Sequence, residues 1–416
     1  MTGPGSDSTR VHSGADVEAH VEAALRLGRP GTVGAELEQF VVDRRAPGVR
    51  PPLERVERAL AGLDLPGRSA ISNEPGGQVE LSSVPCRGPA AAVDALSRDL
   101  AAVRDRLAGE DVLLVGLGAD PERPPVRQLD TPRYQVMEAF FERDGDAGRL
   151  MMCSTAAVQV SLDAGVAGDG VQSALQRWQR AHAVGPALVA AFACSPLLAG
   201  RPTGWSSSRQ EVWSRVDPSR TCAPDPGLGP VQALTRLALT ARLMTVRDAE
   251  GVCRPAPPGL TFGDWVAGCG PTAPTVADLD YHLTTLFPPV RARGWFELRY
   301  LDALPADLWQ VAVAVAAVLV DDDVAADQAR AACAPVEGRW LRAARVAVSD
   351  RALGHAAVAC LGAAEQALTR AAAPALAAAV AAYVERFTAR GRCPADEVLE
   401  AHRAGRPLLA AREVAA

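Results

Sequence analysis

Hydrophobic and polar residues alternate at every second position in four short stretches of the chain. These stretches are 32-TVGAELEQFVVD-43, 78-QVELSS-83, 155-TAAVQVSLD-163 and 294-GWFELRYLDA-303. Because residues i and i+2 of a strand lie on the same face, the alternation predicts strands with one apolar and one polar face. A fifth stretch, 112-VLLVGLGADP-121, predicts a buried strand that continues into a loop.

Helical segments separate these strands. Apolar spacing and Pro or Gly boundaries predict helices at 15–28, 53–62, 88–108, 131–144 and 171–193. From about residue 305 the chain is rich in Ala and predicts further helices, with breaks at Pro335 and Pro374. The apolar run 311–320 is too short to cross a bilayer and predicts a buried helix. We therefore expect an α+β fold with a largely antiparallel sheet.

The chain divides into three predicted parts. Residues 1–14 are polar and lack the apolar segment of a signal peptide, so we expect a disordered tail. Residues 15–305 hold the strands and form the expected core, and residues 306–416 form a helical region packed on it within a single large domain. Residues 195–230 are rich in Ser, Pro, Gly and Arg, which predicts a long functional loop.

Composition restricts the partners and the chemistry. The net charge of −6 argues against nucleic acid or a membrane surface as a partner, because both call for a basic patch. The chain contains no lysine, so all 43 basic residues are arginines, and a P-loop lysine or catalytic lysine is excluded. The nine cysteines are scattered without a CxxC pair. This usage fits free thiols in a reducing cytoplasm, where we expect the protein to be located.

Carboxylates gather on the polar face of the predicted sheet. Glu36 and Glu38 share a face of the first strand, Glu80 lies on the second, and Glu297 lies beside Arg299 on the last. A solvated sheet face would explain each Glu alone. Glu is uncommon in strands, however, and adjacent carboxylates repel unless a cation neutralises them. The set predicts a hard cation such as Mg²⁺ or Mn²⁺, which would hold nucleotide phosphates while arginines contact the transferred phosphoryl group.

Five blocks of sequence resemble the glutamate–cysteine ligases. In chain order they are GAELEQFVVD, EPGGQVELS, MMCSTAAVQVSLD, SPLLAGRPTGWSSSRQEVWSRVDPSR and DLDYHLTTLFPPVRARGWFELRYLDA. The resemblance covers roughly residues 31–305. It is strongest to the actinobacterial branch that serves ergothioneine synthesis, which is related to the plant-type enzymes. It implies a glutamine-synthetase-like catalytic fold, with metal ligands on the concave face of a curved antiparallel sheet and helices on its outer face.

The resemblance also implies a reaction. ATP would convert the γ-carboxylate of L-glutamate into an acyl phosphate, and the amine of L-cysteine would then displace phosphate to give γ-glutamylcysteine. The implied metal ligands are Glu36, Glu38, Glu74, Glu80 and Glu297. Arg299 would reach the ATP phosphates. Gln159 stands where the broader superfamily often has a histidine ligand, so its contact with metal or with ATP stays open.

Further substrate-binding residues are implied in two segments. They are Arg133, Tyr134, Arg201, Trp205, Arg209 and Arg220. A loop arginine is often only a solvated charge. Arg209 and Arg220 are nevertheless favoured to hold the substrate α-carboxylate and the acyl phosphate through bidentate contacts, with Trp205 and Trp213 as walls. Arg209 and Arg299 are the expected catalytic residues. Structural roles are expected for the Cys153 thiol and for His282.

Three other functions stay open. A ligase of the same fold could use a different amine, because the blocks do not define the acceptor pocket. A non-catalytic relative could bind nucleotide or amino acid as a regulator, although the acidic set is complete. Phosphoryl transfer to a guanidino group shares the fold but matches the blocks less well. The expected partners are small molecules only, namely L-glutamate, L-cysteine and ATP. The sequence indicates no oligomeric state, and a monomer is compatible with it.

Overall fold

The centre of the protein is an eight-stranded sheet, seen in a computed structural model that describes residues 9–247, 252–305 and 308–409. Its strand order is β11-β12-β6-β1-β3-β2, and β4 and β5 also pair with β1. All these pairs are antiparallel, as the alternation predicted. The strands are β1 Thr32–Asp43, β2 Ala70–Asn73, β3 Val79–Ser82, β4 Cys86–Arg87, β5 Val112–Val115, β6 Ala157–Asp163, β11 Val290–Ala292 and β12 Trp295–Asp302.

The two faces of the sheet differ in burial as the sequence predicts. Val33, Ala35 and Leu37 of β1 are buried, whereas Glu36 and Glu38 between them are half-buried. The register places Glu38 opposite Glu80 of β3, and Glu36 opposite Gln159 of β6. Strand pairing therefore brings polar positions that are far apart in the sequence side by side in two adjacent rows of the polar face.

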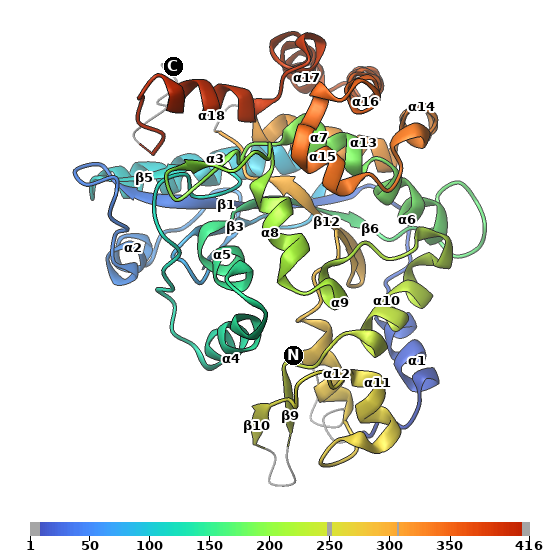
Figure 1. Cartoon of the computed structure of the whole chain (residues 1–416). Helices are drawn as coiled ribbons and strands as arrows, with labels where there is room; N and C mark the ends of the chain where they lie inside the picture. The colour runs from blue at the N-terminus through green and yellow to red at the C-terminus, as the bar shows by residue number, and fades with distance from the viewer. Residues whose placement is uncertain (1–8, 248–251, 306–307, 410–416) are drawn as a thin grey trace.

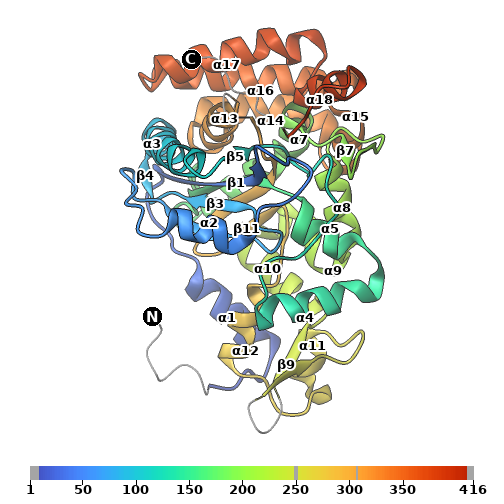
Figure 2. The same cartoon turned by 90° about the vertical axis from the view of Figure 1, so that its left-hand side faces the viewer.

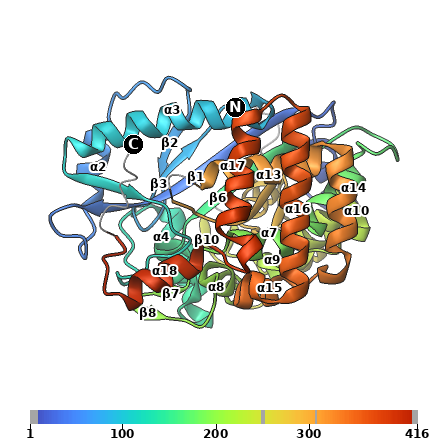
Figure 3. The same cartoon turned by 90° about the horizontal axis from the view of Figure 1, so that it is seen from above.

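The C-terminal helices cover the apolar face of the sheet. Figure 3 shows them lying over the strands together with α3. Their apolar side chains and those of the strands form one continuous core, in which eleven residues of α13 are buried. No helix in the described ranges is long and apolar enough to cross a membrane. The helices on this side are α3 Gly88–Ala108, α6 Ala174–Ala183, α7 Gly185–Phe192, α13 Trp309–Asp321, α14 Asp323–Cys333, α15 Trp340–Val346, α16 Arg351–Arg370, α17 Pro374–Arg386 and α18 Pro394–Arg403.

Shorter elements border the polar face and form a lobe beneath it (Figures 1 and 2). Helices α4, α5 and α8 pack on each other around a small core of methionine and aromatic side chains. The lobe has an apolar cluster of its own, built from α1 and from residues between 231 and 286. These elements are α1 Gly14–Ala24, α2 Leu53–Leu60, α4 Pro132–Phe141, α5 Ala147–Ser154, β7 Leu197–Leu198, β8 Arg201–Pro202, α8 Ser208–Val216, α9 Pro218–Thr221, α10 Gly229–Thr240, β9 Thr245–Arg247, β10 Cys253–Pro255, α11 Phe262–Asp264 and α12 Val276–Leu283.

Two predictions about helices are corrected. The helix expected at 171–193 is divided into α6 and α7, since Pro186 in the first turn of α7 has no N–H group to continue the ladder. The loop expected at 195–230 holds helices α8 and α9. Helix α8 begins at a cap in which the Ser207 hydroxyl accepts a hydrogen bond from the Gln210 backbone N–H.

The expected tail is also shorter than predicted. Val11 is 2% exposed, and its backbone N–H donates to the Pro274 carbonyl at 2.8 Å. Ser13 then caps α1. The prediction of a tail at 1–14 is therefore wrong from residue 9 onward, while residues 1–8 lie outside the described part of the chain.

Candidate active site

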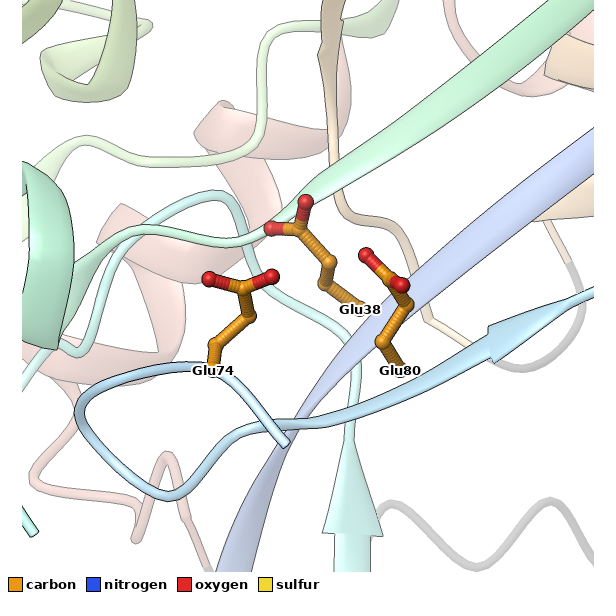
Figure 4. A group of neighbouring side chains, drawn as sticks. All are labelled: Glu38, Glu74 and Glu80. Atoms are coloured by element: carbon orange, nitrogen blue, oxygen red, sulfur yellow. The ribbon is translucent and has the colours of Figure 1, made fainter. Parts of the chain in front are cut away.

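Three carboxylates converge at one end of the polar face. Glu38 lies on β1, Glu80 on β3, and Glu74 at the turn between β2 and β3. Each offers an oxygen within 4.8 Å of the others, and Figure 4 shows their carboxylates turned toward a common space. Ser72 and Ser82 donate hydrogen bonds to Glu80 Oε1 at 2.8 and 3.2 Å, which fix the direction of that side chain.

The Pro-Gly-Gly turn brings Glu74 beside Glu80. The Gly77 N–H donates to the Glu74 carbonyl, and Gly77 has a φ of 83°, which favours glycine. A Cβ atom on Gly76 would come within 2.3 Å of the Cys153 carbonyl oxygen. The turn therefore needs its first glycine for close packing on α5 and its second for the backbone angle.

The carboxylates strongly disfavour one another's charge. Burial, then Glu297 and Glu80, raise the pKa of Glu36 to about 8. Burial followed by the neighbouring glutamates raises the pKa of Glu38 to about 8 and that of Glu74 to about 7. A cation beside the set would favour its ionised form, and its hard oxygen donors fit Mg²⁺ or Mn²⁺. The residues present therefore suit a divalent metal.

The raised pKa values predict that metal-free protein loses stability as the pH rises. In the unfolded chain these carboxyls titrate near the ordinary value of 4.5, but in the folded protein they keep their protons up to about pH 7 to 8. Their contribution is complete below pH 4.5 and is lost as the pH rises to 8.

Thermal melts of EDTA-treated protein should thus show a lower Tm at pH 8.5 than at pH 6, and Mg²⁺ should raise Tm more at pH 8.5. Glu38→Gln should flatten this dependence relative to the exposed control Glu57→Gln. An equal Mg²⁺ effect at both pH values would contradict the assignment.

Glu297 differs from the other carboxylates because it is paired with arginines. Arg291 Nε and Nη2 donate to its two oxygens at 2.6 and 3.0 Å, and Arg299 Nη1 donates to Oε1 at 3.0 Å. Burial alone would raise the pKa of Glu297, but Arg291 and Arg299 outweigh it and lower the pKa to about 2. Glu297 is therefore ionised and positions two guanidinium groups in this structure.

Gln159 joins the acidic cluster to the arginine pair. Its Nε2 donates to Glu38 Oε1 at 2.9 Å, and its Oε1 accepts a hydrogen bond from Arg299 Nη1. Glu38 Oε2 in turn accepts from the Ala157 backbone N–H at 2.8 Å. The amide therefore fixes the spacing between Glu38 and Arg299.

A cavity of about 450 Å³ lies over this floor. Its acidic end contains Glu38, Glu74 and Glu80, and its basic edge is formed by arginines of β11 and β12. The wall opposite the sheet is apolar and comes from α4, α5 and α8. The residues that line the wall and the mouth are Arg133, Tyr134, Met137, Met151, Met152, Thr155, Trp213, Thr284 and Phe287.

Arg209 lines a small neighbouring pocket with Trp213, Phe287 and Arg299 and has unused hydrogen-bond donors. Asp302, buried at the end of β12, accepts hydrogen bonds from the hydroxyls of Ser195 and Ser207, and the Ser195 oxygen accepts from the Arg209 backbone N–H. The Arg209 Nη2 group donates to the Arg299 carbonyl at 2.7 Å. Its Nε and Nη1 are buried without a hydrogen-bond partner among the described residues. The guanidinium lies 5.8 Å from the centre of the Trp213 ring.

Comparison with known proteins gives the family. The profile of glutamate-cysteine ligase family 2 matches residues 32–414, which include every residue that lines the cavity. The chain belongs to glutamate-cysteine ligase family 2.

The chain is similar to two mycobacterial relatives over most of its own length and most of theirs. It is 45% identical to the glutamate–cysteine ligase EgtA of Mycolicibacterium smegmatis over 353 residues, 82% of each chain. It is 42% identical to EgtA of Mycobacterium tuberculosis H37Rv over 395 residues, 92% of this chain and 89% of that one. A solved glutamate–cysteine ligase of Francisella tularensis in complex with AMP has a TM-score of 0.52 at 13% identity, covering 92% of this chain and 86% of that one. The family resemblance and the α+β fold expected from the sequence are confirmed.

Several sequence-predicted residues of this family 2 chain meet in the cavity. Its lining includes all five predicted metal ligands together with Gln159, Arg133, Tyr134 and Arg299. Arg133 donates to the side chain and carbonyl of Thr284 at 2.9 and 3.1 Å, which joins α4 to the lobe. Burial and the charge of Glu74 raise the pKa of Tyr134 to about 12, so the phenol stays neutral.

Besides Arg209, three further predicted residues lie outside the cavity lining. Arg201 is exposed on the short β7–β8 hairpin, and Trp205 packs under the guanidinium of Arg345 at 5.8 Å. Arg220 is fully buried and donates to Asp217, to both oxygens of Thr285 and to the Arg242 carbonyl. Arg220 therefore braces α9, and the expected substrate contact is not supported for these three side chains.

The sequence reasoning missed one arginine of β11 and one of the turn that follows it. Arg291 and Arg293 both line the cavity, and Arg291 holds Glu297. Their signal was the alternation in VRARGWFELR, where a turn at Gly294 folds one arginine-bearing strand against Glu297. The expectation for His282 agrees with the structure, since its ring stacks on Phe262 and its Nε2 is 2.9 Å from the Ala238 carbonyl oxygen.

Proposed function

We propose that the protein is an ATP-dependent glutamate–cysteine ligase that forms γ-glutamylcysteine through γ-glutamyl phosphate. The observation that carries this proposal is the meeting of Glu38, Glu74 and Glu80 with Arg299 in one cavity of a family 2 chain. The name glutamate–cysteine ligase of the mycobacterial relatives supports it.

The proposed reaction has two successive steps, a phosphoryl transfer and an acyl transfer. In the first, a γ-carboxylate oxygen of glutamate attacks the terminal phosphorus of ATP and ADP leaves. In the second, the amine nitrogen of cysteine attacks the acyl carbon, phosphate leaves, and the amine loses a proton. Glu36, Glu38, Glu74 and Glu80 would hold Mg²⁺ or Mn²⁺, which would neutralise phosphate charge. Arg299 would stabilise charge on the transferred phosphoryl group.

The remaining parts of the cavity suit the amino-acid substrates. In the small pocket beside the cavity, the unpartnered Nη1 of Arg209 would donate a hydrogen bond to a carboxylate or to the acyl phosphate. The wall formed by Met137, Met151 and Met152 is apolar and polarisable, as a small thiol side chain requires. These features support a cysteine acceptor over a charged amine.

The acceptor is tested by its effect on ADP release. With ATP, Mg²⁺ and L-glutamate present, L-cysteine should stimulate ADP release at least about ten-fold more than L-alanine or glycine at equal concentration, because the apolar wall adds binding energy for the thiol side chain. L-2-aminobutyrate, which is close to cysteine in size, is the matched control and should give intermediate rates. Stimulation by another amine in the absence of any response to cysteine would overturn the acceptor assignment.

The cellular setting follows from the same proposal. We propose ergothioneine biosynthesis as the pathway, on the basis of the five sequence blocks, and the cytoplasm as the location, on the basis of cysteine usage. The partners are then small molecules, with a monomer as the simplest working unit.

A further inference from the structure

A tryptophan stands on the polar face of the sheet beyond the arginine pair. Trp295 begins β12, and its side chain is 38% exposed. Phe296 and Leu298 point into the core, so Trp295 shares the opposite face with Glu297 and Arg299. Among the large apolar side chains that are exposed in the described ranges, Trp295 is the only aromatic one.

Cations border this tryptophan. Arg293 lies next to it across the β11–β12 turn, is exposed, and lines the cavity. Arg26 lies over Gly294 between them, with its backbone N–H 3.1 Å from the Gly294 carbonyl oxygen. An exposed indole with two exposed arginines close by in the chain fold is suited to an aromatic ligand that carries negative charge.

The floor between Trp295 and the acidic cluster is shallow. Ser161 of β6 lies opposite Glu297, and Gly34 of β1 lies opposite Ser161. Both are only half-buried. Asp163 lies opposite Trp295, and its carboxylate accepts the Thr32 backbone N–H at 2.8 Å, which holds it at the strand end. A flat group can therefore extend along the strands from the cavity toward Trp295.

We propose that Trp295 is the nucleobase-binding residue of the site, with the adenine ring of ATP stacked on its indole and Arg293 at the edge. This inference rests on the proposed function, because it takes ATP as the activating substrate. It assigns the phosphates to the carboxylates and Arg299, and the amino acids to the apolar wall under α4, α5 and α8.

The spacing of the strand supports this orientation. Residues two apart on a strand are about 7 Å apart, so Trp295 lies about 7 Å from Glu297 and about 13 Å from Arg299. A nucleoside must leave the acidic cluster in some direction, and Met137, Met151 and Met152 close the opposite side. A nucleoside that extends along β12 would pass the small residues Ser161 and Gly34 and reach the exposed ring of Trp295.

A lone exposed hydrophobic side chain is common on protein surfaces and needs no ligand. Trp295 differs because it lies on the face that holds the cavity, and because Arg293, which lines that cavity, is two residues away from it. Stacking on an aromatic ring binds any base by its flat face, which suits a nucleotide whose phosphates are fixed elsewhere.

The test compares binding of ADP with binding of pyrophosphate, which has no base. In calorimetric titrations with Mg²⁺ and without amino acids, Trp295→Ala should bind ADP about ten-fold more weakly than the wild type. Pyrophosphate affinity should stay unchanged, which also shows that the variant is folded. Trp295→Phe keeps an aromatic face and should restore most of the ADP affinity. The exposed control Leu341→Ala should match the wild type with both ligands.

Kinetics and fluorescence separate stacking from a structural role. The KM for ATP should rise about ten-fold in Trp295→Ala, while kcat and the KM for glutamate should stay at wild-type values. ADP should quench tryptophan fluorescence in the wild type and not in Trp295→Phe.

Wild-type ADP affinity in Trp295→Ala, or an equal loss of ADP and pyrophosphate binding, would overturn the assignment of Trp295 and leave the ligase proposal intact. A wild-type protein that turns over no ATP with glutamate would instead overturn the proposed function. The ADP titrations contain no cysteine, so their interpretation does not depend on whether cysteine is the acceptor.

Discussion

Replacing Arg299 with alanine is expected to lower kcat about a thousand-fold. Arginines that stabilise charge on a transferred phosphoryl group contribute on this scale, and buried donors aimed at developing charge contribute almost as much. Arg299 is held at this position by Glu297 and Gln159 and lies 5.9 Å from the rings of Trp213 and Phe287. Steady-state ADP release at saturating ATP, glutamate and cysteine would measure the loss.

Two further variants locate the cause of that loss. Arg299→Lys keeps the charge but replaces the planar guanidinium by an ammonium that cannot make bidentate contacts with a phosphoryl group, so its kcat should lie between those of the wild type and the alanine variant. Arg390→Ala removes an exposed arginine near the C-terminus and should retain wild-type kcat. If Arg299→Ala turned over within ten-fold of the wild type while melting normally, Arg299 would have no role in phosphoryl transfer.

Replacing Glu80 with glutamine is expected to weaken Mn²⁺ or Mg²⁺ binding and turnover by at least about 100-fold. Loss of groups that merely orient a metal ligand already costs 10- to 100-fold, and this change removes a charged ligand itself. The amide can keep the hydrogen bonds from Ser72 and Ser82, so the strand geometry should persist. Mn²⁺ titration followed by electron paramagnetic resonance would measure metal affinity without turnover.

A matched substitution tests whether charge at this place matters. Glu57→Gln removes an exposed carboxylate from α2 and should leave both metal affinity and kcat unchanged. High Mg²⁺ should partly restore the turnover of Glu80→Gln, because weak ligand sets fill at higher concentration. Wild-type metal affinity in Glu80→Gln would remove Glu80 from the metal site.

The sequence could predict the strands and the acidic face because both depend on local alternation. Glu36, Glu80 and Glu297 each lie between two apolar residues, Glu38 follows Leu37, and period-two burial follows from strand geometry alone. The register that sets Glu38 opposite Glu80 depends on contacts between distant segments. For that reason the residues of the polar face could be predicted from the sequence, but not which of them lie opposite one another on paired strands.

Arg209 and Arg220 show what could not be predicted from the sequence. Arg209 and Arg220 lie in the same block and are both buried. Arg220 donates hydrogen bonds to Asp217 and to the carbonyls of Arg242 and Thr285. Two donors of Arg209 have no partner among the described residues. Which of two like side chains meets a partner depends on the packing of distant segments, and local pattern does not encode it.

The core behind the sheet ties the site to the unfolding of the whole protein. Val33 and Leu37 alternate with the glutamates of β1 and belong to the same apolar cluster as Val313 and Leu361 of the C-terminal helices. Detaching those helices would expose the back of the strand that carries Glu36 and Glu38. We therefore expect the backbone amides of Glu36 and Glu38 to exchange with solvent only in large cooperative openings. The helices that never touch substrate thereby preserve the spacing on which the chemistry depends.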